Sequence, residues 1–234
     1  MRAAILFLLF TFSALASYSH SIWIQTNPYA KKGEKQEVKV FFGAYESNKP
    51  DSTKKWYSDI EEFILTVSAP DGKSILLKTS QEALFFKADF IADQEGTYTF
   101  SISHPVKDLY KGSKLSYYAL ANVQVGNVTS SKKQGEELAL SLLQDGKTFN
   151  QNQAIRQQLI FKNIPLVKQN VTIVAPDLVS IEVQTDSKGA FRFTPKQKGV
   201  YFIEAFYEED NAGTHNGLAY KKAWHMVTQQ LTSK

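Results

Sequence analysis

The residues of this chain best suited to chemistry are its four histidines, because the chain has no cysteine. Imidazole is a common protein ligand for nickel, copper and zinc, so a cysteine-free metal site must combine it with carboxylates, backbone groups or a terminal amine. His20 follows an apolar N-terminal segment, His104 precedes Pro105, and His215 and His225 lie near the C-terminal end. Transition-metal binding is therefore the first hypothesis.

Acidic residues accompany the C-terminal histidines. Glu208 and His215 share the loop EEDNAGTHNG (208–217), where carboxylate and imidazole ligands can converge. The predicted metal ligands are His20, His215, His225 and Glu208, with His20 as the anchor. A solvated or structural role is the alternative for each of them. We expect Trp224 and His225 on opposite faces of the last strand, with Trp224 buried.

The N-terminal segment MRAAILFLLFTFSALA has the layout of a secretory signal peptide: Arg2, an apolar run, then small residues. We expect a signal peptide over residues 1–19, export to the periplasm and no membrane span in the mature chain. Cleavage is predicted after residue 16, 17 or 19.

The cleavage position decides the chemistry of His20. As the first residue, His20 can chelate one ion with its α-amine and its ring. As the third residue, it would join the amine and two backbone amides in a square-planar nitrogen site, which suits Cu(II) or Ni(II). As the fourth residue, it forms neither chelate as neatly.

Most of the remaining chain alternates apolar and polar residues, as in QEVKVFF (36–42) and VSIEVQT (179–185). This period of two is typical of half-buried strands, and turn signals such as Pro70-Asp71-Gly72 separate them. The pattern predicts an all-β chain with two immunoglobulin-like antiparallel β-sandwich domains in tandem. GEELALSLL (135–143) fits a helix or a strand, and its context favours a strand.

The chain also repeats itself, because residues 63–103 align with residues 171–207. Each copy has a strand ending in Ala-Pro-Asp, two further strands, and a glycine followed by a tyrosine-bearing strand. The repeat predicts an N-terminal sandwich over 20–126, a linker over 127–134 and a C-terminal sandwich over 135–234. Tyr98 and Tyr201 are the expected corner tyrosines of the two sandwiches.

Several functional classes have no support in the sequence. There is no hydrolase elbow, phosphate-binding glycine loop or zinc-enzyme helix motif, so we expect a protein that is not an enzyme. The net charge of +4 includes Arg2, and lysines are interspersed with acidic residues. We therefore expect no nucleic-acid partner.

Three stretches carry a family likeness. They are His20-Ser21-Ile22-Trp23-Ile24, the turn Lys32-Gly33-Glu34, and VTIVAPD (171–177) followed by TDSKGAFRFTPKQKGVYFIEAFYEE (185–209). On these the chain resembles an exported bacterial family of unknown function that is associated with nickel and cobalt uptake. The second half also resembles transthyretin-like, or carboxypeptidase-regulatory, sandwiches. The chain departs from the family at Ala44, where many relatives have a histidine after the glycine.

The resemblance implies a periplasmic metal-binding accessory protein that serves an envelope metal-uptake transporter. Nickel is the favoured ion, with cobalt, copper or zinc as alternatives, and an open coordination sphere would suit delivery. The competing hypothesis is a non-catalytic module that binds carbohydrate or protein through exposed aromatic residues, such as those of KKWYSD (54–59) and LSYYAL (115–120). Converging histidines would favour the first hypothesis, and an exposed aromatic strip the second.

Overall fold

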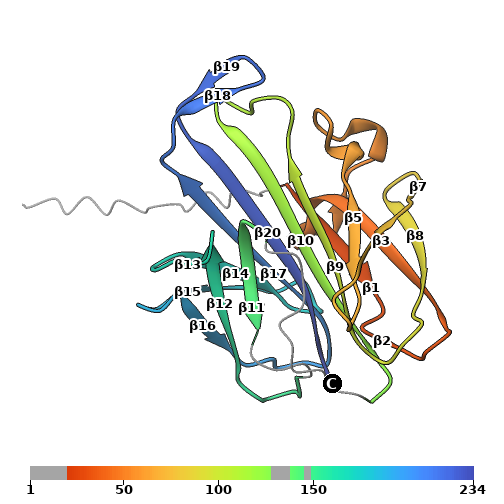
Figure 1. Cartoon of the computed structure of the whole chain (residues 1–234). Helices are drawn as coiled ribbons and strands as arrows, with labels where there is room; N and C mark the ends of the chain where they lie inside the picture. The colour runs from red at the N-terminus through yellow and green to blue at the C-terminus, as the bar shows by residue number, and fades with distance from the viewer. Residues whose placement is uncertain (1–19, 128–137, 145–148) are drawn as a thin grey trace, which may run out of the picture.

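The computed structural model describes residues 20–127, 138–144 and 149–234 (Figure 1). The predicted signal peptide before His20 and residues 128–134 of the predicted linker lie outside the described residues. The all-β prediction is confirmed, because the described residues form strands and three short 3₁₀ turns but no α-helix. None of their helical segments is long and apolar enough to cross a membrane.

The strands form three main sheets and one small hairpin. The five-stranded sheet contains β1 (Ser21–Thr26), β3 (Lys35–Ala44), β4 (Lys49–Pro50), β7 (Ser80–Gln81) and β8 (Phe86–Ile91). The nine-stranded sheet contains β2 (Tyr29–Ala30), β5 (Leu65–Ser68), β6 (Ser74–Leu77), β9 (Gly96–Pro105), β10 (Lys114–Val125), β14 (Asn170–Val174), β15 (Ser180–Gln184), β17 (Gly199–Glu209) and β20 (Ala223–Ser233).

The remaining elements are shorter. The four-stranded sheet contains β11 (Leu140–Gln144), β12 (Ile155–Phe161), β13 (Ile164–Pro165) and β16 (Ala190–Phe193). The hairpin pairs β18 (Gly213–His215) with β19 (Leu218–Tyr220), and the 3₁₀ turns are η1 (Tyr45–Ser47), η2 (Thr53–Lys55) and η3 (Ile60–Glu62). The described part of the ambiguous segment 135–143 enters β11, as predicted.

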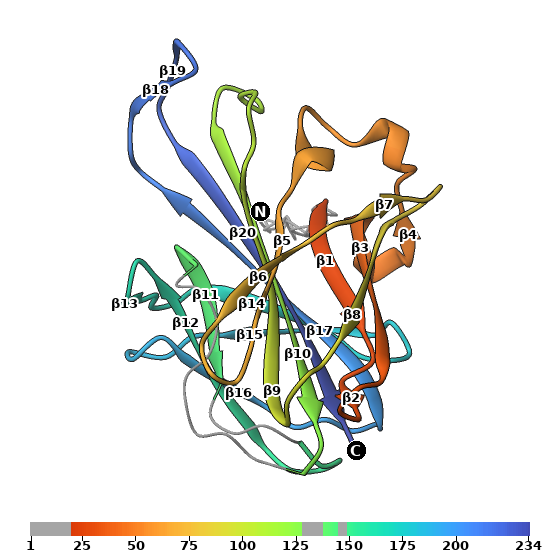
Figure 2. The same ribbon diagram turned by 45° about the vertical axis from the view of Figure 1, so that its right-hand side comes forward.

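The nine-stranded sheet is shared by two sandwiches (Figure 2). On β10, Tyr117 and Ala119 belong to a core shared with the five-stranded sheet, whereas Tyr118 and Leu120 belong to a second core shared with the four-stranded sheet. The strands of each half join edge to edge where β10 pairs with β20 in parallel. Because both faces of β10 are covered, its sequence is a nearly continuous apolar run instead of an alternating one.

The internal repeat is visible in atomic contacts. Gly96 and Gly199 precede the corner tyrosines with φ of +129° and +131°. A Cβ on Gly96 would lie 2.7 Å from Pro70 Cγ, and one on Gly199 would lie 2.9 Å from Pro176 Cγ. Each glycine therefore allows the same close approach of the Ala-Pro-Asp turn in its own copy.

Both corner tyrosines hydrogen-bond to a segment just before them in the chain, as predicted. The Tyr98 hydroxyl donates to Asp93 Oδ1 at 2.7 Å and accepts from the backbone N–H of Gln94 at 3.1 Å. The Tyr201 hydroxyl donates to the carbonyl of Gln197 and accepts from its N–H, both at 3.0 Å. These bonds fix the turns that lead into β9 and β17.

The outer edge of β1 is closed by side chains of β20 instead of by a neighbouring strand. The Gln230 amide accepts from the N–H of Thr26 at 2.9 Å and donates to its carbonyl at 2.8 Å. The Thr228 hydroxyl donates to the carbonyl of Ile22 at 2.7 Å. These bonds satisfy backbone groups that an open edge strand would expose, and they fix the start of β1 against the last strand of the chain.

Candidate functional site

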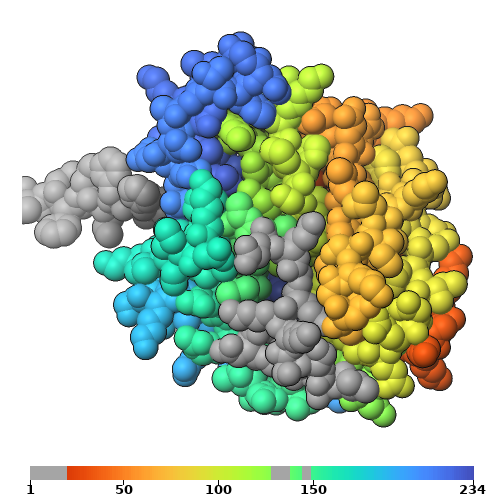
Figure 3. Space-filling model, viewed as in Figure 1, coloured from red at the N-terminus to blue at the C-terminus, as the bar shows by residue number. Residues whose placement is uncertain are grey.

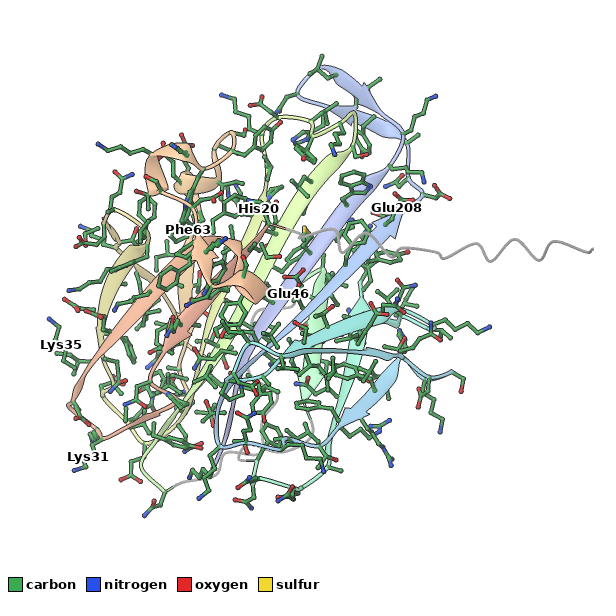
Figure 4. The ribbon with its side chains drawn as sticks, turned by 180° about the vertical axis from the view of Figure 1, so that it is seen from behind. His20, Lys31, Lys35, Glu46, Phe63 and Glu208 are labelled. Atoms are coloured by element: carbon green, nitrogen blue, oxygen red, sulfur yellow. The ribbon has the colours of Figure 1, made fainter. Side chains whose placement is uncertain are left out.

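His20 lies directly before β1, on the rear side of the molecule in Figure 4. Its Nε2 is 3.4 Å from Asp51 Oδ2, and the two side chains are 49% and 36% exposed. The imidazole packs against Phe42, with 5.7 Å between the ring centroids. One nitrogen ligand and one oxygen ligand thus lie side by side and are open to solvent.

Asp51 is held opposite His20 by the hairpin between β3 and β4. The Asp51 N–H donates to the carbonyl of Phe42 at 2.8 Å, and Gly43 pairs with Pro50. Gly43 has φ of +145°, and a Cβ there would lie 2.7 Å from the carbonyl oxygen of Lys49 and 2.9 Å from the Asp51 nitrogen. The absence of a side chain at Gly43 therefore allows the close approach that positions Asp51.

Further carboxylates lie on the same side of the molecule. The Ser21 hydroxyl donates to Glu204 Oε2 at 2.7 Å, and Figure 4 shows Glu46 on the same rear side as His20. Tyr45 packs on Phe202 with 3.9 Å between ring centroids, and burial raises the pKa of Tyr45 to about 12. Glu204 thus contacts the residue that follows His20, whereas Tyr45 stays neutral.

His215 has a structural partner. Its Nε2 donates to the carbonyl of Val106 at 2.8 Å, and the Asn216 amide donates to the carbonyl of Lys107 at 2.9 Å. These bonds join the β18–β19 hairpin to the connection between β9 and β10, and Figure 3 shows the two segments packed together at the upper end. His215 therefore holds a hairpin in place and is not turned toward the other predicted ligands.

Of Trp224 and His225 on the last strand, His225 is the more buried, so the expectation that Trp224 is the buried one was wrong. His225 is 6% exposed and Trp224 only partly buried, because the four-stranded sheet covers the His225 face of β20. Nδ1 of His225 is 3.2 Å from the Tyr118 hydroxyl, and Nε2 is 3.1 Å from Glu209 Oε2. Burial lowers the pKa of His225, so its neutral form is favoured.

Glu208 is also engaged with protein groups. It accepts from the Trp224 indole N–H at 2.9 Å and forms an ion pair with Lys222. The hydrogen bond from Lys222 is the main cause that lowers the pKa of Glu208. Figure 4 shows Glu208 at the end of β17, apart from His20.

The predicted ligands do not assemble into one metal site. Within residues 20–127, 138–144 and 149–234, no group of three or more histidine or acidic side chains is arranged to hold a metal ion. The first and last strands do meet, as such a site would require, but His215, His225 and Glu208 each bind other protein groups. His104, with Nε2 3.3 Å from Asp59 Oδ1, is likewise buried in a structural contact.

His20 as a metal ligand stays a prediction, and nothing in the sequence indicated that Asp51 would lie beside it. The sequence around Asp51 has no motif that indicates a metal ligand, and only the hairpin register brings this residue beside His20. The aromatic stretches proposed as exposed were also wrong in part, because Trp56, Tyr117 and Tyr118 are at most 7% exposed. Their side chains fill the two cores, which periodicity alone does not reveal when a strand is covered on both faces.

These features define a class: two β-sandwiches joined through one shared sheet, with an exposed histidine–carboxylate pair at the start of the first strand. The profile of one family matches residues 17–209. The chain therefore belongs to the family described as Domain of unknown function (DUF4198). That assignment agrees with the resemblance to a family of unknown function, and the family description adds neither an activity nor a location to it.

Other comparisons give only remote likenesses. No curated protein matches the chain. Among solved structures, the Salmonella alpha-2-macroglobulin reacted with methylamine is 11% identical, with a TM-score of 0.29, over 92% of this chain and 15% of that chain. A two-domain fibronectin type-III segment from chicken tenascin is 12% identical, with a TM-score of 0.27, over 89% of this chain and 97% of that chain. This chain thus spans only a small part of the macroglobulin.

Proposed function

We propose that the protein is a metal-binding accessory protein of the bacterial periplasm that holds a first-row transition metal at His20 and passes it to an envelope uptake transporter. The observation that carries this proposal is the exposed pair formed by His20 and Asp51, whose Nε2 and Oδ2 atoms are 3.4 Å apart. An imidazole and a carboxylate are suitable ligands for nickel, cobalt, copper and zinc.

The third ligand is the α-amine of His20 when the leader is cleaved after residue 19. The donor set is then two nitrogens from one residue and one oxygen from Asp51. Cleavage after residue 17 gives instead the four-nitrogen arrangement centred on the same imidazole, with Asp51 beside it. Both forms depend on His20, and both favour Ni(II) or Cu(II) by their nitrogen content.

An exposed site with few protein ligands suits transfer of the ion. Open positions allow a partner to supply ligands before the first ones dissociate, whereas a closed four-ligand site releases metal slowly. The backbone beneath the site is rigid, because Thr228 and Gln230 hold β1 and the Gly43 turn holds Asp51. The protein would thus present the ion on a fixed surface, without catalytic chemistry of its own.

The first experiment determines the N-terminal residue of the exported protein by intact mass and titrates the same material with Ni(II), Co(II), Cu(II) and Zn(II) by calorimetry. We expect binding tighter than about 10 µM for at least one ion, roughly 7 kcal/mol. His20→Ala should abolish most of this binding. Asp51→Asn, which retains the size of the side chain, should weaken it about tenfold.

His215→Ala is the matched control, because it removes a half-buried imidazole of β18 that has another partner. Its affinity for metal should equal that of the unmodified protein. Weaker binding than about 10 µM for all four ions would overturn the proposal. Unchanged affinity in His20→Ala would remove His20 from the site.

A further inference from the structure

A row of four aromatic rings lies at the end of the molecule near the β18–β19 hairpin. Tyr57 contacts Tyr110 at 5.5 Å between centroids, Tyr110 contacts Trp224 at 6.1 Å, and Trp224 contacts Phe206 at 6.0 Å. Tyr110 and Phe206 are 39% and 42% exposed, and Tyr57 and Trp224 are partly buried. Four segments that are distant in sequence thus bring their rings to one surface. We call these four residues the aromatic row.

Two rings of the aromatic row, those of Tyr57 and Trp224, are held in place by hydrogen bonds before any ligand arrives. The Tyr57 hydroxyl donates to the carbonyl of Leu109 at 3.0 Å, and the Trp224 indole N–H donates to Glu208 at 2.9 Å. Phe206 and Trp224 lie on the paired central strands β17 and β20. Little side-chain entropy would therefore be lost at Tyr57 and Trp224 when a ligand packs on the row.

Polar groups are interleaved with the rings, which separates this surface from an ordinary apolar patch. Lys111 Nζ lies 5.3 Å from the Tyr110 centroid, and Glu208, held by Lys222, contacts the Trp224 ring nitrogen. The centre of a protein–protein interface is depleted in charged residues. On this surface a charged group lies beside each of two neighbouring aromatic rings. Such a surface suits a ligand in which apolar faces and polar groups also alternate from one ring to the next.

The angles between the rings further restrict the class of ligand that fits this surface. Trp224 makes angles of 62° with Tyr110 and 75° with Phe206, so the surface is stepped. A flat fused ligand cannot follow such steps. A chain of sugar rings can, because each unit offers an apolar C–H face and a rim of hydroxyls, and the linkages allow successive units to tilt. We propose that the aromatic row is a binding site for an extended oligosaccharide, independent of the metal proposed at His20.

Tryptophan fluorescence tests this site directly. Of the three tryptophans, Trp23 and Trp56 are 4% and 7% exposed, so a surface ligand acts mainly on Trp224. The full-length mature protein is titrated with two probes, the hexamer of β-linked N-acetylglucosamine and maltohexaose. We expect a saturable change with one of them. Tyr110→Ala and Phe206→Ala should each weaken its binding about three- to tenfold, the range found for aromatic contacts.

Phe85→Ala is the matched control, because Phe85 is a partly buried ring with Lys39 Nζ 4.9 Å from its centroid, on the five-stranded sheet side. Its affinity for the sugar should be unchanged. Thermal unfolding of each variant verifies that these surface changes leave the fold intact. The absence of saturable binding up to about 10 mM of both probes would overturn the proposal.

Two other outcomes would also overturn it. Equal affinity in the Tyr110→Ala and Phe206→Ala variants would place the sugar elsewhere. Binding of a proline-rich peptide in the same assay, with no response to either sugar, would show a protein-docking groove instead. A failure to bind sugar leaves the metal titration at His20 unaffected, so the two proposals are tested separately.

Discussion

Gly43→Ala tests the role of the tight β3–β4 turn in positioning Asp51. The added Cβ would meet three backbone atoms: Lys49 O at 2.7 Å, Asp51 N at 2.9 Å and Pro50 Cα at 3.0 Å. Backbone cannot yield as the end of a flexible side chain does, so β4 must move. Crowding of this kind costs about 1–3 kcal/mol, and alanine at φ +145° adds about 1–3 kcal/mol.

The expected loss is therefore about 2–6 kcal/mol, which lowers the thermal midpoint by roughly 4–24 °C in a chain of this size. Thermal unfolding followed by circular dichroism measures the shift. The same variant should bind metal more weakly, because Asp51 moves away from His20.

Gly33→Ala separates the two causes, since Gly33 has φ of +78° but no atom within 4 Å of the added Cβ. Gly33→Ala should lower the free energy of unfolding only by the cost of the unfavourable backbone conformation, about 1 kcal/mol. The reasoning would be refuted if both variants lost the same stability, or if Gly43→Ala unfolded within about 2 °C of the unmodified protein.

Three further predictions follow from the buried polar contacts. Gln230→Leu leaves the N–H and carbonyl of Thr26 without their partner and should cost about 2–4 kcal/mol in urea unfolding; a loss below about 0.5 kcal/mol would contradict the closure of the β1 edge by Gln230. Tyr98→Phe removes the hydroxyl bonded to Asp93 and should lower stability by about 1–2 kcal/mol, measured by calorimetry, with an unchanged melting curve as the contrary result. Burial holds the pKa of His225 below 6.5, so the unfolded chain binds more protons as the pH falls through that value. The free energy of unfolding should therefore decrease as the pH falls through about 6.5, and His225→Gln should reduce this pH dependence. The same pH dependence in both proteins would show that other groups cause it.

Local pattern was sufficient to predict most strands and the repeat. The alternation in residues 36–42 and the glycine–tyrosine spacing before Tyr98 and Tyr201 correspond to β3 and to the two corners. The strand and the corners depend on interactions between residues close in sequence, so the spacing of residue types in one sequence is enough to predict them. The all-β class follows from the same information.

The joining of the two sandwiches was not predictable in this way. β10 and β20 pair in parallel although they lie far apart in the chain, and an apolar run specifies burial without specifying what covers it. For the same reason the sequence LSYYAL suggests exposed aromatic rings, whereas Tyr117 and Tyr118 fill cores on opposite faces. The partner of His20 was missed because hairpin register, not composition, brings Asp51 beside it.

The closure of the β1 edge by Gln230 has a consequence for the timing of folding. Thr26 and Gln230 are separated by 204 positions, so β1 leaves the ribosome long before its partner exists. At about 5–20 residues per second, that interval is roughly 10–40 s. During this time the outer edge of β1 has no permanent partner, and the first sandwich cannot reach its final form. The protein must therefore complete its fold after synthesis, with its first and last strands closing together.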